Sequence, residues 1–367
     1  EAVIIPSAVE QGYGGFTIQL DSTRAPLVRE PLSRLLNYRL AATTYLLPYG
    51  YHALPGILFP ETLEQMLPDS ARSPQVAGKA YFNRASNYQW EDGGIRISSS
   101  SISSSPRASL QTARLIRLAK DSGLQEIISG RLDQHKLNLY LKEIASDEKV
   151  SLYFRCWAVS ELSMAGHHQP EIVSELSKYE DKLGLTGYAH LTIASLSQGS
   201  KTQAKGFWKR MKNFLAISTR SIDLEETYEN AGYFDSEIEQ LSILLNVAVL
   251  MDESDDFISR LAESIGRRIQ AERWLSYSDC EAAAVAFDAV LENESGADTD
   301  FTASVNVAES NIMLSGFQGV SDKPETSTVD FSKEPLSDLE KDKPYVMRFE
   351  KEGTGTLFYT STIEYAL

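Results

Sequence analysis

The sequence predicts an α+β fold in which a ring of paired helices is inserted into an antiparallel β-sandwich. Both ends of the chain alternate apolar and polar residues with a period of two, which is typical of half-buried strands. The long middle has an apolar period near 3.6, which is typical of helices. Strands at both ends are most simply explained by one sandwich, residues 1–23 plus 298–367, whose two halves flank a helical domain, residues 24–297.

The predicted strands begin near the N-terminus and resume after the helices. Phe16, Ile18 and Leu20 face one way after a glycine-rich turn at residues 12–15. Near the C-terminus, turn-rich charged segments such as 334–342 separate further alternating stretches. The residues expected to share the half-buried faces of those stretches are Ala303, Val305 and Val307, then Ile312 and Leu314, then Leu357, Tyr359, Ser361 and Ile363.

The middle of the chain can be divided into helices by their expected caps and breakers. The fourth is the best marked, because Ser105 suits the N-cap, Pro106 suits the first helical position and Gly123 follows as a stop. About twelve helices result, and an even series of short hairpins predicts a closed ring of about six helical pairs rather than a bundle. The expected helices lie near 31–47, 60–67, 74–86, 106–122, 133–145, 148–165, 170–183, 186–198, 201–217, 235–251, 255–272 and 279–292.

The composition excludes several classes of protein. The 367 residues are 42% apolar, enough to bury a substantial core. The formal net charge of -16 argues against a nucleic-acid partner, because neutralising phosphates needs clustered Lys and Arg. No apolar run is long enough to span a membrane. Because the first residue is not Met and no signal peptide follows it, we expect a piece of a longer polypeptide.

Neither the cysteines nor the histidines predict a redox or metal site. Cys156 and Cys280 are far apart, and each lies in an apolar helical pattern, so both are predicted to be small buried hydrophobic residues. His135, His190 and the histidine pair at 167–168 have no further ligands at zinc-motif spacing. The sequence therefore predicts no metal and no cofactor.

The most informative segment is Pro-Tyr-Gly at residues 48–50, followed by Tyr51, His52, Ala53 and Leu54. It resembles the thioester segment of the alpha-2-macroglobulin family, in which a Pro-Tyr-Gly turn is followed at once by Cys-x-Glu-Gln. In that family the thiol and the amide condense into an acylating bond. Here Tyr51 stands at the cysteine position, and Ala53 and Leu54 stand at the Glu and Gln positions, so no thioester can form from these side chains. We expect Tyr51 to fill apolar space and His52 to have a packing or surface role.

Three further blocks carry the same resemblance. Gln-Trp-Glu-Asp-Gly-Gly at 89–94, followed by a helix with Thr112 and Ala113, is similar to a Gln-x-x-Asp-Gly-Gly turn and Thr-Ala helix of bacterial alpha-2-macroglobulins. Residues 274–277 resemble the turn before the family's last toroid helix, and residues 353–359 resemble a glycine-rich strand of its surrounding β-domain. The resemblance covers nearly the whole chain and implies an α/α toroid thioester domain inserted into a CUB-like sandwich.

The resemblance also implies a function. Bacterial members of the family are envelope proteins that trap proteases after cleavage of a bait region, so this chain is expected to be a non-enzymatic fragment of such an endopeptidase inhibitor. Without a thioester, it is expected to act through conformational change or docking. The implied partners are the remaining macroglobulin domains of the parent chain and proteases, and the implied location is the periplasm or the cell surface.

Two alternatives remain open at this point. Asp252, Asp255 and Asp256 form the strongest acidic cluster, and an aspartate-rich helix end can bind magnesium and a diphosphate. Because terpene cyclases share the α/α toroid, an enzyme acting on isoprenoid diphosphate is one alternative, although a solvated loop and helix N-cap explain the same residues more simply. The other alternative is a structural envelope scaffold whose toroid mouth binds a neighbouring domain.

Overall fold

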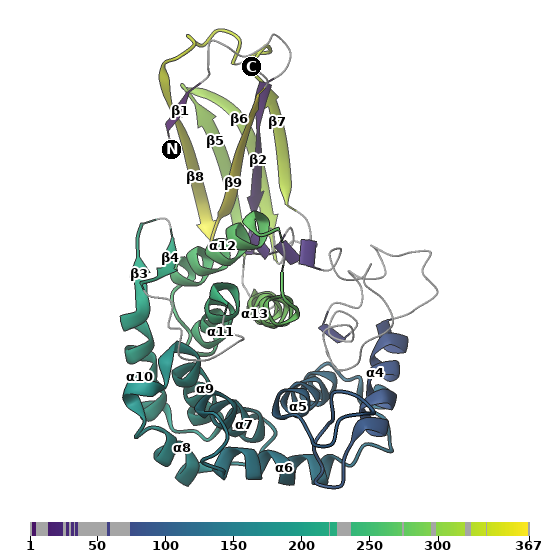
Figure 1. The fold of residues 1–367 in the computed structure, drawn as a ribbon. Coiled ribbons are helices and arrows are strands. Elements are labelled where there is room, and N and C mark those ends of the chain that lie inside the picture. The colour runs from purple at the N-terminus through teal and green to yellow at the C-terminus, as the bar shows by residue number, and fades with distance from the viewer. Residues whose placement is uncertain are drawn as a thin grey trace. The chain divides into compact units, whose positions relative to one another are not determined.

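The chain combines helices with antiparallel sheets, as the predicted α+β class requires (Figure 1). It divides into two compact units, one formed by Glu1–Arg29 with Val290–Leu367 and the other by Glu30–Ala289. The computed structural model describes residues 2–4, 14–24, 27–28, 31–32, 34–35, 57–58, 74–219, 221–225, 236–273, 275–294, 299–319, 324–334 and 336–365.

The unit built from both chain ends contains two antiparallel sheets. Its described strands are β1 (Ala2–Ile4), β2 (Gly14–Asp21), β5 (Asp300–Val307), β6 (Ser310–Gln318), β7 (Glu325–Asp330), β8 (Pro344–Thr354) and β9 (Phe358–Tyr365). One sheet has the order β1-β8-β5-β6 and the other has the order β7-β2-β9. The N-terminal strand β2 therefore pairs on both sides with strands from the far end of the sequence.

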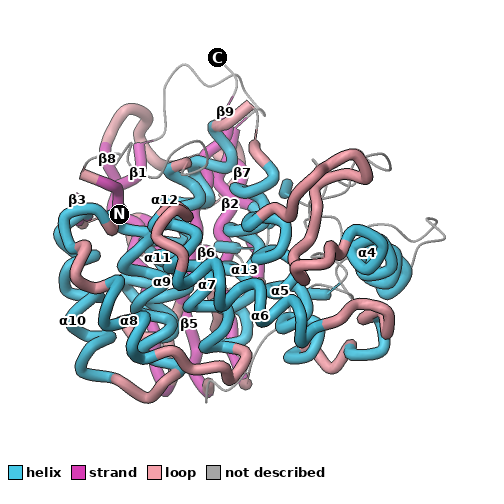
Figure 2. The backbone as a smooth tube through the Cα atoms, turned by 60° about the horizontal axis from the view of Figure 1, so that its bottom comes forward, coloured by secondary structure: helices cyan, strands magenta, loops and turns pink. Residues whose placement is uncertain are grey.

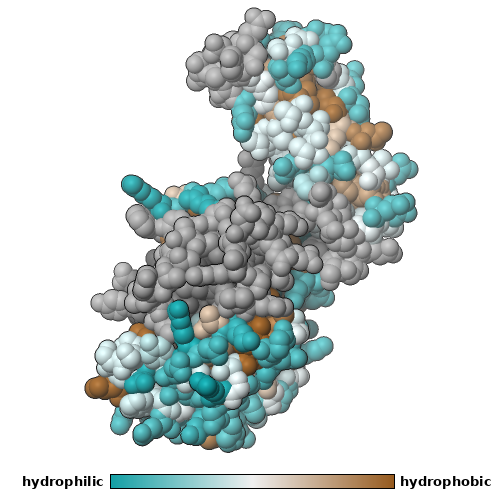
Figure 3. All heavy atoms as spheres, turned by 90° about the vertical axis from the view of Figure 1, so that its right-hand side faces the viewer, coloured by the Kyte–Doolittle hydropathy of each residue, from teal (hydrophilic) through white to brown (hydrophobic). Residues whose placement is uncertain are grey.

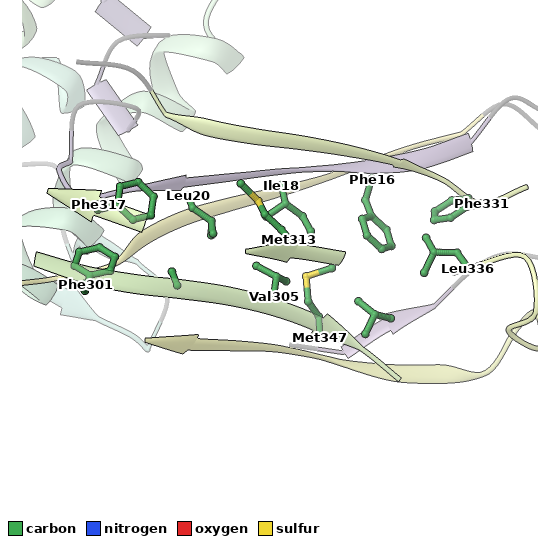
Figure 4. Packing of buried hydrophobic residues seen from close by; sticks show 12 residues of the cluster. Phe16, Ile18, Leu20, Phe301, Val305, Met313, Phe317, Phe331, Leu336 and Met347 are labelled. Atoms are coloured by element: carbon green, nitrogen blue, oxygen red, sulfur yellow. The ribbon is translucent and has the colours of Figure 1, made fainter. Parts of the chain in front are cut away.

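The core of this unit lies between the two sheets (Figure 4). Phe16, Ile18 and Leu20 of β2 are all buried and face residues of the other sheet, among them Val305 of β5 and Met347 of β8. Side chains alternate along a strand, so every second residue of β2 and β5 enters the core. The period-two faces predicted for these two strands are confirmed.

The face predicted for β6 is wrong at one position. Leu314, predicted on the half-buried face, is 68% exposed, whereas Met313 is only 8% exposed. Directly opposed residues in neighbouring strands share a face, and Met313 lies opposite the buried Val305. The register shifts between Val305 and Asn306, so Ile312 is an extra residue in β6 without a direct partner in β5. Strict alternation from Ile312 therefore places Leu314 on the wrong face.

The other unit is helical. The described helices are α4 (Pro74–Tyr88), α5 (Pro106–Asp121), α6 (Gln134–Ser146), α7 (Leu152–Met164), α8 (Pro170–Leu176), α9 (Gly184–Ser197), α10 (Lys201–Met211), α11 (Glu237–Leu250), α12 (Asp255–Ala271) and α13 (Tyr277–Glu294). A short hairpin of β3 (Leu215–Ile217) and β4 (Ile222–Leu224) follows α10. The predicted helix near 201–217 is therefore too long, because its last residues form β3 instead.

Three further predicted helices differ from the structure or lie outside its described residues. The helix expected near 170–183 ends at Leu176, and a 3-10 turn at Glu180–Lys182 precedes α9. The helices expected near 31–47 and 60–67 fall almost wholly outside the described residues. The remaining predicted helices agree with the structure to within a few residues at each end, the usual uncertainty of a helix boundary.

The helices of this unit form an inner and an outer row (Figures 1 and 2). In the inner row, α7 packs against α5 and α9, and α9 packs against α11. In the outer row, α6, α8, α10 and α12 each pack on the inner helices next to them. The inner helices are covered on several sides, which explains why α7 and α9 are buried almost all round, whereas α12 buries one stripe.

The described surface is mainly hydrophilic on the face shown in Figure 3, with hydrophobic residues in small scattered groups. Single exposed apolar side chains are normal on a folded protein. Among the described helices, none is both long enough and apolar enough to cross a lipid bilayer.

Candidate functional site

The residues at the expected thioester position lie outside the described part of the chain; these are Tyr51, His52, Ala53 and Leu54. Both cysteines are described. Cys156 on α7 and Cys280 on α13 are fully buried, and neither forms a disulfide bond, as predicted. Burial raises the pKa of the Cys156 thiol to about 12, so this thiol is protonated and unreactive at neutral pH.

The glutamine of the block at 89–94 fixes the turn after α4. Gln89 Nε2 donates to the carbonyl oxygens of Gly93, at 3.0 Å, and of Asp133, at 2.8 Å, and Gln89 Oε1 accepts from Asp133 N at 2.8 Å. Gly93 has φ = 92°, and a Cβ there would overlap the backbone of Lys136 at the start of α6. The conformation and the close approach both require glycine.

The aspartate of the same block closes the turn from the other side. Asp92 Oδ1 accepts from Gly94 N at 2.9 Å and from Ser104 Oγ at 2.6 Å. A Cβ on Gly94 would overlap Ser104 and the ring of Tyr140. The block that resembles the macroglobulin turn therefore anchors the end of α4 and the loop before α5 to α6.

The threonine of the first block and the block at 274–277 are also structural. On α5, Thr112 Oγ1 lies 2.8 Å from the hydroxyl of Tyr81 on α4, and both side chains are buried. In the block at 274–277, Ser276 N donates to Asp279 Oδ2 at 2.8 Å, and Asp279 N donates to Ser276 Oγ at 3.1 Å. This reciprocal pair satisfies amides at the start of α13.

A buried charge cluster occupies the middle of the inner row. Glu161 of α7 accepts from Arg114 Nε at 2.9 Å, from Arg117 Nε at 3.3 Å and from Trp157 Nε1 at 2.9 Å. Burial alone would raise the pKa of the Glu161 carboxyl, but the charges of Arg117 and Arg114 and two donated hydrogen bonds lower it to about 2. Glu161 is therefore ionised at all ordinary pH values.

A second carboxylate extends this cluster to α13. Glu281 lies 3.4 Å from Arg114 Nη1 and accepts from Gln111 Nε2 at 2.8 Å. Burial raises the pKa of Glu281, and Arg114 only partly offsets it. The cluster joins α5, α7 and α13, so its charges hold together helices that are far apart in sequence.

Aromatic rings cover the other side of the cluster. The guanidinium of Arg114 lies 4.6 Å from the ring centroid of Trp157, and His190 of α9 stacks on Trp157 with ring centroids 6.0 Å apart. Burial, followed by the charge of Arg114, lowers the pKa of His190 to about 3, so its imidazole is neutral. His190 is thus a packed core residue.

These groups face a pocket with a cavity volume of about 50 Å³. Its walls come from α5, α7, α9, α11 and α13, and its polar lining includes Arg114, Arg117, Tyr153, Glu161, His190 and Glu239. The sequence did not predict this site, and His190 was considered only as a metal ligand and discounted. The available signal was the presence of charged residues inside mostly apolar helices, for example Arg155 and Glu161 in α7.

The acidic cluster considered as a diphosphate site lies on the surface, away from the central pocket. Asp252, Asp255 and Asp256 are exposed, and none of them lines the central pocket. Ser254 caps α12 by accepting from Phe257 N at 3.3 Å, so two of the aspartates occupy the first helical turn, where negative charge is favourable. Among the described residues, no group of three or more His, Cys, Asp or Glu side chains is arranged to hold a metal ion. The exposure of the three aspartates agrees with the simpler interpretation, a solvated loop and N-cap.

Comparisons with known proteins give similarity at the level of structure. Neither the models of protein families nor the curated proteins contain a match. Salmonella alpha-2-macroglobulin reacted with methylamine matches with a TM-score of 0.58 and 13% identity, over 100% of this chain and 23% of that chain. Escherichia coli alpha-2-macroglobulin from domain MG7 to the C-terminus matches with a TM-score of 0.61 and 14% identity, over 97% of this chain and 55% of that chain.

A third structure extends the comparison. Escherichia coli alpha-2-macroglobulin activated by porcine elastase matches with a TM-score of 0.63 and 13% identity, over 99% of this chain and 31% of that chain. This chain thus spans about a quarter of the length of the Salmonella protein and about half of the Escherichia coli fragment. At identities this low, a structural match shows a common fold and nothing finer. The chain therefore shares its fold with part of the bacterial alpha-2-macroglobulins.

Proposed function

We propose that this chain is a thioester-type domain of a bacterial macroglobulin-like protein that has lost its thioester. In this proposal, residues 24–297 form an α/α toroid and residues 1–23 plus 298–367 form a CUB-like sandwich. The protein belongs to the periplasm or the cell surface and takes part in protease trapping without being an enzyme. The observation that carries the proposal is the structural similarity to bacterial alpha-2-macroglobulins over nearly the whole chain.

The sequence and the thiol chemistry support the loss of the thioester. A thioester needs a cysteine and a glutamine, and the matching positions hold Tyr51 and Leu54. The remaining cysteines, Cys156 and Cys280, are buried. The domain therefore contributes to trapping by changing its position or by docking, and not by forming a covalent bond to the protease.

Protease capture by the full-length parent protein tests this function. The parent is incubated with an active protease, and the mixture is separated by size under native and under denaturing conditions. We expect protease to migrate with the parent under native conditions only, after cleavage of the parent chain, because no acyl bond links the two. A protease that remains attached after denaturation would contradict the proposal. Cleavage without any capture would leave the scaffold as the better function.

One feature favours the scaffold as a second candidate. In the loop between α4 and α5, Ile102 is 93% exposed, Ile97 is 49% exposed and Trp90 is 36% exposed. Ile102 is the most exposed of them, and if these side chains form one surface, that surface is a candidate contact for another domain or protein. Replacing Ile102 with Ser should weaken the association of this chain with the rest of its parent if the loop docks there, as measured by co-purification of the separately expressed parts.

A further inference from the structure

The pocket between the inner helices is electrically balanced. The guanidinium groups of Arg114 and Arg117 and the carboxylates of Glu161 and Glu239 line it, and their formal charges cancel. The two guanidinium groups already donate to Glu161, and Glu239 accepts from the hydroxyl of Tyr153 at 3.2 Å. A ligand in this pocket would meet neither a net positive nor a net negative charge, so an uncharged ligand suits it best.

Two deeply buried polar atoms in the pocket wall lack a partner among the described residues. They are Nδ1 of His190, a residue 2% exposed, and Oγ of Ser242, a residue 0% exposed. His190 lies on α9 and Ser242 on α11, two helices that pack against each other, and both residues line the pocket. Each unpaired buried polar atom costs free energy, so both favour a bound group that can donate and accept hydrogen bonds.

The size of the cavity limits what can bind. A volume of about 50 Å³ has room for about three to five water molecules, since one water needs about 10–15 Å³ of such a cavity. The rest of the lining is apolar and includes Met164, Ile193, Ile243, Ala282 and Val285. A molecule of this size with hydroxyl groups on a short carbon chain would satisfy the two polar atoms and also contact these apolar side chains.

We propose that this pocket is a binding site for a small uncharged polyol of about the size of glycerol, with His190 Nδ1 and Ser242 Oγ as its hydrogen-bonding partners. The Ser242 hydroxyl donates to one ligand oxygen or accepts from it, and His190 does the same in either neutral tautomer. The charge cluster acts here as a rigid wall, because its own hydrogen bonds keep the guanidinium groups in place.

Titration of the ¹⁵N-labelled 367-residue chain with glycerol tests the proposal. The indole N–H of Trp157 donates to Glu161 in the pocket wall, so its NMR signal senses the pocket. The indole N–H of Trp208 on α10, in the outer row of helices, donates to Glu253, so its signal is an internal control. We expect a saturable shift of the Trp157 signal with a dissociation constant in the millimolar range. Acetate, methylammonium and glycine should bind more weakly than glycerol.

Matched serine variants locate the binding. Ser242→Ala should weaken glycerol binding about fivefold, the usual contribution of one hydrogen bond. Ser259→Ala on α12 is the control, because Ser259 also has a buried hydroxyl without a partner among the described residues but does not line the pocket. Equal binding by Ser242→Ala would overturn the proposal, as would a charged ligand that binds more tightly than glycerol. If Ser242→Ala does not fold, the ligand preference of the unmodified chain decides the matter, and the absence of a saturable Trp157 shift overturns the proposal.

Discussion

Glu161 shows how one residue stabilises the centre of the helical unit. Its carboxylate is held by two arginines from α5 and by the indole of Trp157. Removing one member of a buried charge cluster leaves the others uncompensated. We expect Glu161→Gln to lower the free energy of unfolding by roughly 3 kcal/mol at pH 7. Urea denaturation followed by circular dichroism measures this loss.

The same residue predicts a pH dependence. The folded pKa of Glu161, about 2, lies below its ordinary value of 4.5. A carboxyl of this kind stabilises the fold above its unfolded pKa, and that contribution disappears as the pH falls toward the folded pKa. The stability difference between the native chain and Glu161→Gln should therefore shrink between about pH 5 and pH 2. Glu281, whose pKa is raised by burial and in part by the charge of Glu161, acts in the opposite direction and does not cancel, so both proteins are compared in a Glu281→Gln background. A difference that stays constant over this range would contradict the assigned role of Glu161.

The glycine of the turn after α4 gives a second prediction at this scale. Gly93→Ala should destabilise the chain by about 2 kcal/mol, because a side chain would force both a strained φ and an overlap with Lys136. Gly130→Ala is a matched control, since a Cβ there has open space and the φ of Gly130 lies outside the left-handed region. Thermal unfolding compares the two variants. Equal melting temperatures would show that the turn can relax around the new methyl group.

At the scale of elements, the caps account for where α5 begins. Ser105 accepts from Ala108 N at 3.4 Å at the start of α5, whereas the side chain of Ser151 makes no capping hydrogen bond at the start of α7. We expect Ser105→Ala to cost about 1 kcal/mol and Ser151→Ala to cost much less. Chemical denaturation of the two variants checks the difference, and a larger loss in Ser151→Ala would contradict the assignment.

The sequence predicts the ends of a helix well where local caps mark them, and less well where the next residues pair with a distant strand. Ser105, Pro106 and Gly123 mark both ends of α5 because caps and breakers act within a few residues. The end of α10 at Met211 was harder to predict, because the next residues, Leu215–Ile217, leave the helix to pair with β4. Pairing of this kind depends on a partner strand and not on local propensity.

The central pocket could not be predicted for a related reason. Periodicity assigns charged residues such as Arg114 and Arg117 to the solvent side of a helix. They are partly buried because Glu161, more than forty positions away in sequence, accepts hydrogen bonds from them inside the unit. Contacts between residues this far apart in sequence depend on how the helices pack against one another, and that packing cannot be predicted from the pattern of a single sequence.

At the scale of the whole molecule, the sequence predicts the α+β class because alternating patterns at both ends enclose a long helical middle. The order of the strands follows from long-range pairing, in which β2 lies between β7 and β9. The fold is shared with part of the bacterial alpha-2-macroglobulins, and the proposed difference from a thioester-bearing protein is that Tyr51 and Leu54 stand where the cysteine and the glutamine would be.

The mass of the intact chain after treatment with methylamine tests this central claim most directly. Salmonella alpha-2-macroglobulin, whose structure has been determined after reaction with methylamine, serves as the positive control. For this chain we expect an unchanged mass and the same two thiols, counted after denaturation, before and after treatment. A mass increase equal to one methylamine, with a thiol newly released, would contradict the account.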